Sequence, residues 1–157
     1  MKIEEQVLSI EQARHLQELG LNMSDAALCL VSKSYVQKQD TWGCIYNEDI
    51  PLNERKWNVT INDFMDNIRG YEYTPVYTLQ EMLHKLPPSI QANGESFDLI
   101  YQTGECAGYA TPGYHYGWDD QPYGTLDFFI CFNSGNGIQD VYDLVCWAIS
   151  YEYLKIK

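Results

Sequence analysis

Apolar residues recur at helical spacing in three segments, and the first two of these begin with a capping pattern. In Ser9–Leu19, the first residue and Gln12 have the spacing of a capping box, in which each side chain satisfies the other's backbone donor. Thr78–Leu86 repeats the box with Glu81, and Pro87 then stops the pattern because proline cannot continue a helix. The pattern therefore predicts a helix in each segment.

The third apolar segment is the longest and runs from Ile138 to Leu154. Asn136 precedes it as a candidate cap, and acidic residues stand near its first turn, where they favour the positive end of a helix. Apolar and aromatic residues occupy most of its circumference. We therefore predict a C-terminal helix that is covered on more than one side.

Alternating apolar and polar residues predict strands between the second and third helices. Asn93-Gly94 is a strong signal for a two-residue hairpin, because both turn positions need a positive φ. It joins a short strand at Ser89–Ala92 to a longer one at Glu95–Thr103, and a later strand covers Thr125–Phe132. Because successive strands usually pair as neighbours, we predict an antiparallel sheet.

The front half carries weaker signals. Ala27–Tyr35 and Arg55–Thr60 have the composition of strands, Asn62–Ile68 that of a short helix, and Gln39–Pro51 that of a loop. The predicted fold class is α+β, with an antiparallel sheet packed against a long C-terminal helix and shorter N-terminal helices. We expect one domain over residues 1–157, in which residues 77–157 form the hairpin, strand and helix unit.

Length and charge narrow the classes of partner. The 157 residues suffice for one domain, and the net charge is −12. No lysine or arginine occurs from Leu86 to Leu154, a stretch with nine acids. We expect no direct nucleic-acid binding, because affinity for phosphate backbones comes mostly from lysine and arginine. A basic protein is the partner that such a surface attracts, although solubility alone also explains it.

Hydropathy and cysteine usage indicate the compartment. No stretch approaches the length of a membrane span, and glutamates occupy the place of a signal-peptide core. Five cysteines without a closely spaced pair favour reduced thiols over disulfides or zinc. We expect a cytoplasmic protein without membrane contact, cofactor or metal.

Gly104–Gly124 is the most unusual segment, because it combines five glycines with five aromatic residues. Long ordered loops often carry function, and tyrosine and tryptophan suit recognition. The candidate binding residues, for a protein partner or a small ligand, are Tyr109, Tyr114, His115, Tyr116, Trp118, Asp119, Asp120 and Tyr123. The alternative is an extra hairpin with Pro112-Gly113 at its turn and tyrosines that pack across the strands.

Catalytic chemistry has little support in the sequence. His115, Asp119 and Asp120 are ordinary metal ligands, but their spacing matches no strong pattern. Known nucleophile, zinc and phosphate-binding motifs do not occur. A Cys–His pair needs spatial adjacency, which the sequence does not show. We therefore predict no catalytic residue.

The segments SIEQARHLQELG, YTLQEMLHKLPPSI and DLVCWAISYEYLK, with the Asn-Gly hairpin, resemble a set of small uncharacterised proteins of gut bacteria. These are often found in prophage or mobile-element surroundings. The resemblance covers Tyr77–Lys155 and the first helix, while Gly104–Gly124 departs from it. It implies a cytoplasmic accessory protein of phage origin and assigns no activity or catalytic residue.

Three functional hypotheses follow. The first is a non-enzymatic protein-binding module that uses the aromatic residues of 104–124. The second is an acidic inhibitor or immunity-type protein that masks a basic nuclease or DNA-binding partner. The third is a small-ligand binder or enzyme built on the same loop. The oligomeric state is left open.

Overall fold

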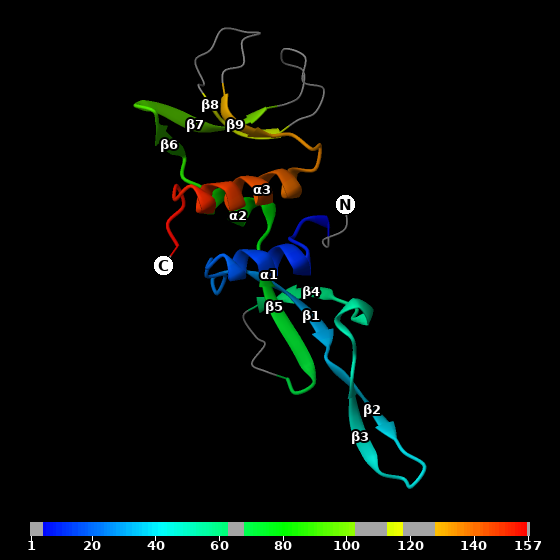
Figure 1. Cartoon of the computed structure of the whole chain (residues 1–157). Coiled ribbons are helices and arrows are strands. Elements are labelled where there is room, and N and C mark those ends of the chain that lie inside the picture. Colours follow the sequence, from blue (N-terminus) through cyan, green and yellow to red (C-terminus); the bar gives the residue numbers. More distant parts are fainter. Residues whose placement is uncertain (1–4, 63–67, 103–112, 118–127, 157) are drawn as a thin grey trace.

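The computed structural model describes residues 5–62, 68–102, 113–117 and 128–156, which form an α+β fold (Figure 1). The described helices are α1 (Ile10–Glu18), α2 (Leu79–Lys85), α3 (Gly137–Ser150) and the short 3₁₀ helix η2 (Leu52–Glu54). The strands are β1 (Leu28–Lys33), β2 (Tyr35–Gln39), β3 (Ile45–Asp49), β4 (Asn58–Ile61), β5 (Tyr71–Val76), β6 (Ser89–Ala92), β7 (Glu95–Gln102), β8 (Gly113–Gly117) and β9 (Phe128–Phe132). The predicted fold class is confirmed.

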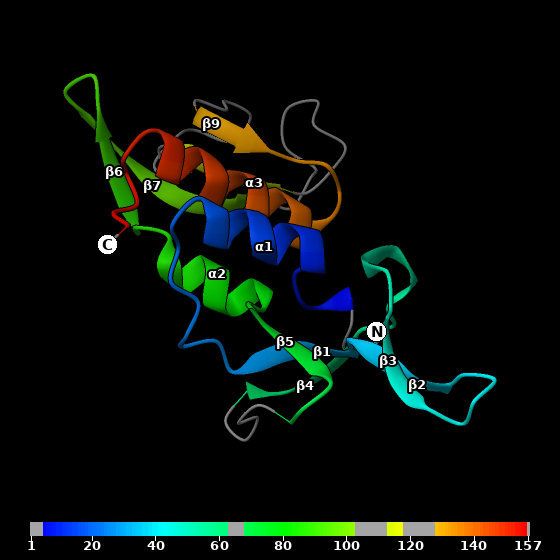
Figure 2. The same ribbon diagram turned by 60° about the horizontal axis from the view of Figure 1, so that its bottom comes forward.

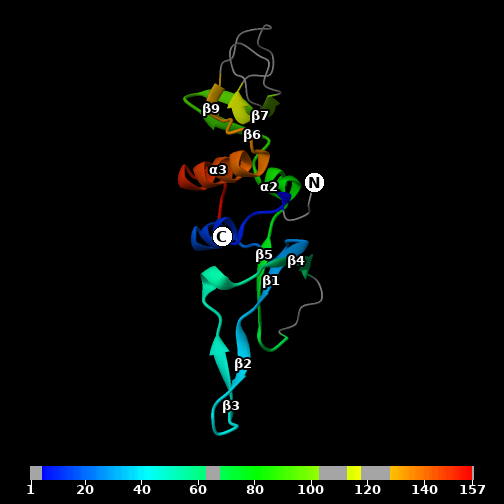
Figure 3. The same cartoon turned by 90° about the vertical axis from the view of Figure 1, so that its right-hand side faces the viewer.

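The described strands form three antiparallel sheets that lie at different levels of an elongated molecule (Figure 3). We call β6-β7-β8-β9 the back sheet and β4-β1-β5 the front sheet. The hairpin β2-β3, Tyr35–Asp49, is called the arm, and it projects from the front sheet away from the helices. The helices fill the space between the back and front sheets (Figure 2).

The two predicted capping boxes are present. The Gln12 backbone N–H donates to Ser9 Oγ at 3.2 Å, and the Ser9 N–H donates to Gln12 Oε1 at 3.0 Å. Thr78 and Glu81 make the same reciprocal contacts at the start of α2. These side chains satisfy backbone donors that a helix start would leave unpaired, so both starts were readable from sequence.

The C-terminal helix ends earlier than predicted, at Ser150 instead of Leu154. Glu152 adopts a φ of 61°, and the Tyr153 N–H donates to Ala148 O at 2.8 Å. A left-handed residue followed by this bond is the Schellman ending. This helix ending could not be predicted from the sequence, because a glutamate and not a glycine occupies the left-handed position.

The back sheet follows the predicted meander with one added strand. Asn93 and Gly94 have φ of 52° and 79°, so the predicted β6–β7 hairpin turn is confirmed. β8 lies between β7 and β9, within a segment that we expected to be a loop. Residues 125–127 of the predicted last strand lie outside the described residues.

In the front half, the predicted strand Ala27–Tyr35 is divided between β1 and β2, and Arg55–Thr60 yields only β4. The prediction of a loop at Gln39–Pro51 was wrong, because β3 pairs with β2 there. The predicted helix at Asn62–Ile68 falls largely on residues outside the described ranges.

The core lies between the two larger sheets and includes side chains from both halves of the chain. Leu16 of α1, Val76 of β5 and Leu144 of α3 are fully buried members of one hydrophobic cluster. α1 and α3 are further linked by a hydrogen bond of 2.9 Å from Gln12 Nε2 to Gln139 Oε1. In the described part of the chain, no helix has the length and apolar character required to cross a membrane.

Candidate functional site

The sequence placed the binding site in Gly104–Gly124, and the structure describes residues 113–117 of that segment. These residues form β8, an interior strand of the back sheet. The alternative hairpin required Gly113 to lie at its turn. Instead, Gly113 pairs with Gln102 within the ladder between β7 and β8. The candidate residues Tyr109, Trp118, Asp119, Asp120 and Tyr123 lie outside the described residues.

The three candidate residues on β8 are in or near the core and not on an exposed loop. Tyr116 is 0% exposed, its hydroxyl donates to Pro87 O at 2.7 Å, and burial raises its pKa. His115 is 4% exposed, and burial lowers its pKa. Tyr114 is half-buried, and its ring centroid lies 4.9 Å from that of Tyr101 on the neighbouring strand. The contact fits the expectation that tyrosines pack across strands.

Exposed apolar side chains are concentrated instead in the part of the chain between residues 36 and 71. Among the described residues, eight of the ten exposed large hydrophobic residues lie between 36 and 71. The eight are Val36, Trp42, Ile45, Tyr46, Leu52, Ile61, Ile68 and Tyr71. The arm carries four of them, and all its residues after Tyr35 are exposed. Several exposed apolar side chains on one hairpin make the arm a candidate interaction surface.

Trp42 stands at the tip of the arm and is 89% exposed. Asp40 shapes the turn around it, because Asp40 Oδ1 accepts the backbone N–H groups of Trp42 and Cys44, both at 2.9 Å. The Gly43 N–H donates to Asp40 O at 3.2 Å and completes the turn. The turn that carries Trp42 is therefore ordered by backbone hydrogen bonds to Asp40. The exposed side chain of Trp42 does not contribute to that order.

The base of the arm is fixed to the front sheet by backbone hydrogen bonds. Ser34 donates its N–H to Gly70 O at 2.9 Å and accepts the Ile50 N–H on its carbonyl at 2.9 Å. The two ends of the arm therefore meet at Ser34. The ring of Tyr35, the first arm residue, lies against Gly70.

Glu72 of β5 connects the arm to the body through two arginines. Arg55 pairs with one carboxylate oxygen, and its Nε donates to Ile50 O at 3.0 Å at the end of the arm. Arg14 of α1 donates to the other oxygen at 2.6 Å and lies over the ring of Trp57, 5.6 Å from its centroid. One carboxylate thus joins α1, β5 and the base of the arm, which holds the arm in a defined orientation.

Cationic and acidic residues both occur around the arm, since residues 33–69 hold five cations and six acids. Five of the ten lysines and arginines lie between residues 33 and 69, although the chain as a whole is acidic. Of these, Lys33, Lys56 and Arg69 form no ion pair with a described residue. Lys33 lines two hollows, of about 370 and 400 Å³, and Arg69 lines the smaller one. The smaller hollow therefore presents two cations, whereas Glu54 also lines the larger one.

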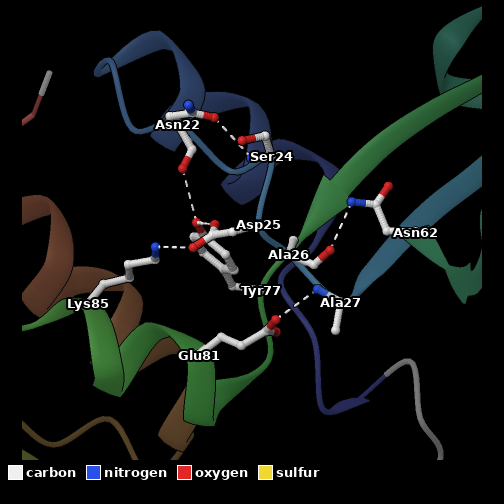
Figure 4. Close-up of polar contacts among 9 residues, drawn as sticks. All are labelled: Asn22, Ser24, Asp25, Ala26, Ala27, Asn62, Tyr77, Glu81 and Lys85. Carbon is white, nitrogen blue, oxygen red and sulfur yellow. Dashed lines mark hydrogen bonds and ion pairs between the residues drawn. The ribbon is translucent and has the colours of Figure 1, made fainter.

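A polar cluster at the opposite end of β1 and β5 from the arm involves Asp25, Tyr77 and Lys85 (Figure 4). The Tyr77 hydroxyl donates to Asn22 O at 3.0 Å and contacts Asp25 Oδ1, while Lys85 pairs with Asp25 Oδ2. The hydrogen bond from Lys85, followed by that from Tyr77, lowers the pKa of Asp25. The cluster links α2 to the loop before β1, and each of its groups already has a partner. The hollow beside it is only about 180 Å³.

One Cys–His pair becomes adjacent in the fold. Cys146 Sγ lies 3.9 Å from His15 Nδ1, which also shares a hydrogen bond of 2.5 Å with the Tyr142 hydroxyl. Burial raises the pKa of the Cys146 thiol, although the hydrogen bond with Tyr142 acts in the opposite direction. A raised pKa favours the neutral thiol over the thiolate, which is the nucleophilic form.

Two further features bear on small-ligand chemistry. A hollow of about 730 Å³ lies between the starts of α2 and α3, and Glu5 is the one ionisable group that the described residues contribute to its lining. The capping side chains Thr78 and Asn136 at its rim already accept helix N–H groups. Residues 5–62, 68–102, 113–117 and 128–156 contain no cluster of three metal-ligating side chains.

Compared with known proteins, the chain matches no protein-family model, no curated protein and no solved structure. The resemblance to small proteins of gut bacteria therefore stays a prediction. Any function must be argued from the chain's own surface.

The arm was not predicted from the sequence, although it is the most exposed apolar element described. The available signal was the turn Asp40-Thr41-Trp42-Gly43, with aspartate first and glycine fourth, as type I turns favour. Flanking residues such as Val36 and Tyr46 have β propensity, but polar residues surround them on both strands. The pattern therefore resembled a loop.

Proposed function

We propose that the protein is a non-enzymatic binding module that recognises a protein partner through the arm. The observation that carries this proposal is the 89% exposure of Trp42 at the tip of an ordered hairpin. Tryptophan is enriched among the residues that dominate binding energy at protein interfaces, because it covers a large area with few rotatable bonds.

The arm has no evident role in folding that would explain its apolar residues. Val36, Ile45 and Tyr46 are 38%, 70% and 46% exposed, and none belongs to the hydrophobic core. Exposed apolar side chains on a two-stranded ribbon carry an aggregation risk. A partner that covers them gives a reason for their presence.

A photo-crosslinking experiment tests the proposal. A photoreactive phenylalanine analogue at position 42 is expected to trap one defined protein in the native host. The matched control is the same analogue at position 151, because Tyr151 is also exposed, at 66%, but lies on the C-terminal segment after α3. The trapped protein is then purified, and Trp42→Ala is expected to weaken its binding by about 2 kcal/mol or more.

Two results would contradict the proposal. Equal crosslinking from positions 42 and 151 would indicate random encounters. Unchanged affinity of the purified partner for Trp42→Ala would show that the arm does not contribute to recognition. The melting temperature of each variant serves as the folding control.

The acidic inhibitor is the second candidate, and the exposure of Glu95 and Asp98 in a segment without cations favours it. Its binding surface would be the back sheet, at the opposite end of the molecule from the arm (Figure 3). A photoreactive group at position 98 would then trap a basic protein, and affinity would fall steeply as salt rises. A partner held by Trp42 would depend much less on salt.

A further inference from the structure

Resting on the proposed function, we infer that the smaller hollow at the base of the arm binds a carboxylate or phosphate group that the partner carries. This hollow has a volume of about 370 Å³ and is lined by two cations. The inference adds a second contact point besides Trp42 and names the chemistry that the partner presents there. It stands on the strand register, the polar side chains of the hollow and the reach of one partner.

The strand from β1 to β2 runs on through Ser34. The Ser34 N–H donates to Gly70 O, and the Ser34 carbonyl accepts the Ile50 N–H, both at 2.9 Å. In an antiparallel ladder the two backbone groups of one residue point to the same edge of the strand. β5 and β3 therefore lie along the same edge of the β1–β2 strand, one after the other.

The hollow lies on one face of this strand. Side chains alternate between the two faces, so those of Lys33, Tyr35 and Gln37 share a face, and all three line the hollow. Tyr71 pairs with Lys33 across the ladder and also lines the hollow, as does Arg69. The site is therefore built from side chains, and it is suited to a side-chain group of the partner.

The polar side chains of the hollow have no partner among the described residues. Lys33 and Arg69 form no ion pair, and the Gln37 amide makes no hydrogen bond. The same holds for the hydroxyl groups of Tyr35 and Tyr71. The described residues contribute no carboxylate to the lining. Two positive charges and several hydrogen-bond donors thus meet in one hollow, which suits an anionic oxygen group.

The neighbouring hollow of about 400 Å³ differs in charge. Lys33 and Lys56 line it, but Glu54 lines it as well. Its third cation, Arg55, is already paired with Glu72. An anion is therefore less favoured in this hollow. Lys56 provides a matched control, because it is a cation near the base of the arm that does not line the smaller hollow.

The backbone holds the walls of the smaller hollow in place. Lys33 and Tyr71 are paired in the β1–β5 ladder, and the bond from Ser34 to Gly70 extends this pairing by one residue. The Tyr35 ring lies directly against Gly70, which has no side chain to separate them. The walls are therefore preformed, and a preformed site loses less affinity to ordering.

A group carried by the partner fits this hollow better than a free small anion does. Small-molecule sites bury most of their ligand, whereas Lys33 and Arg69 are exposed and Tyr71 is 41% exposed. The net charge of −12 also repels free anions at long range. A group on a protein that already contacts Trp42 overcomes both costs, because tethering gives it a high effective concentration.

The hollow and the tip of the arm lie within the reach of one partner. Trp42 follows Gln37 by five residues, which span about 17 Å in an extended chain. Ile45, 70% exposed, pairs with Gln39 and so shares the face of Tyr35 and Gln37. A standard interface of about 800 Å² per partner is about 30 Å across. One interface of ordinary size therefore covers both.

The first test needs no partner. Its probes are inorganic phosphate and glutarate, and chloride at equal ionic strength is the reference. Backbone amide NMR shifts of the full chain are expected to saturate at millimolar concentration for Lys33–Gln37 and Arg69–Tyr71. The double variant Lys33→Gln, Arg69→Gln should weaken this binding about tenfold or more, and Lys56→Gln should leave it unchanged.

The two probes distinguish the sources of the anionic group. Saturation by phosphate alone assigns a phosphate group, saturation by glutarate alone assigns a carboxylate, and saturation by both assigns the chemistry that they share. The inference is overturned if neither probe saturates, or if the double variant and Lys56→Gln bind equally well.

The protein trapped from position 42 provides the second test. Its affinity should fall about tenfold for Lys33→Gln, Arg69→Gln and should then depend less on salt, whereas Lys56→Gln should change neither property. If the double variant melts early, Tyr35→Phe with Tyr71→Phe replaces it, because these substitutions keep both rings and remove only the hydroxyl donors. Undiminished binding by the replacement would overturn the inference.

The outcomes separate this inference from the proposed function. A partner that is weakened by Trp42→Ala but not by Lys33→Gln, Arg69→Gln would overturn the inference and leave recognition by the arm in place. A partner that is unaffected by Trp42→Ala would contradict the proposed function. The NMR titration would then still decide whether the hollow binds an anionic oxygen group.

Discussion

The ring of Tyr35 lies so close to Gly70 that a Cβ on Gly70 would be 3.0 Å from Tyr35 Cζ. Gly70 also has a φ of 91°, a conformation that other residues rarely adopt. This contact joins the first residue of the arm to the turn before β5. It therefore sets the distance between the two walls of the hollow beside β2.

Gly70→Ala is expected to destabilise the protein more than Gly94→Ala. Both positions have a positive φ, which costs a residue with a Cβ about 1–2 kcal/mol, but Gly94 has no atom within 4 Å of the added Cβ. The clash with Tyr35 should add about 1 kcal/mol or more. Urea denaturation of both variants measures the difference, and equal losses would show that the Tyr35 contact is unimportant.

Glu72→Gln is expected to lower the free energy of unfolding by about 1–2 kcal/mol, because Arg55, with a side chain only 11% exposed, loses its charged partner. The control is Glu48→Gln, which breaks a pair whose two side chains are each 49% exposed and should cost less than about 0.5 kcal/mol. Urea denaturation compares the two. Similar small changes would mean that Glu72 does not hold the base of the arm.

Tyr116→Phe is expected to cost about 1–3 kcal/mol, because it leaves the Pro87 carbonyl without its hydrogen bond. Tyr116→Ala should cost about 3–5 kcal/mol through loss of a buried side chain. Tyr151→Phe, at a residue that is 66% exposed, is the control and should change little. A stable Tyr116→Ala variant that loses partner binding would restore β8 as a recognition element.

Asp25 should make the protein less stable in acid. Its pKa is lowered from 3.8 by the hydrogen bonds from Lys85 and then Tyr77, so the folded state favours the ionised form. That contribution is present above about pH 4 and is lost as the pH falls through the lowered folded-state pKa. Thermal melts of the wild type and Asp25→Asn should differ near neutral pH and converge at strongly acidic pH. A constant difference would show that ionisation of Asp25 is not the cause.

The elements that could be predicted carry their own local signals. Ser9 and Thr78 predict helix starts, because the residue that completes each capping box lies three positions later. Asn93-Gly94 predicts a turn that needs positive φ. The end of α3 had no such signal, because Glu152 takes a position usually held by glycine. Local sequence signals therefore predicted which helices and turns form better than they predicted where those elements end.

The candidate site was harder to predict, because exposure depends on what the rest of the fold covers. A tyrosine is equally suited to a surface or to a core that offers its hydroxyl an acceptor, and Pro87 O offers that acceptor to Tyr116. Trp42 had the opposite outcome, since its hairpin points away from the helices. Neither result can be read from the residues within either segment.

The meeting of both ends of the arm at Ser34 has a consequence for how the chain can evolve. Residues 36–49 bury no side chain, and they leave and rejoin the body at one hydrogen-bonded point. Substitutions, insertions or a whole replacement of the hairpin would therefore leave the free energy of folding nearly untouched. Under the proposed function, selection for a new partner and selection for a stable body would act on separate sets of residues, so recognition could diverge rapidly without passing through unfolded intermediates.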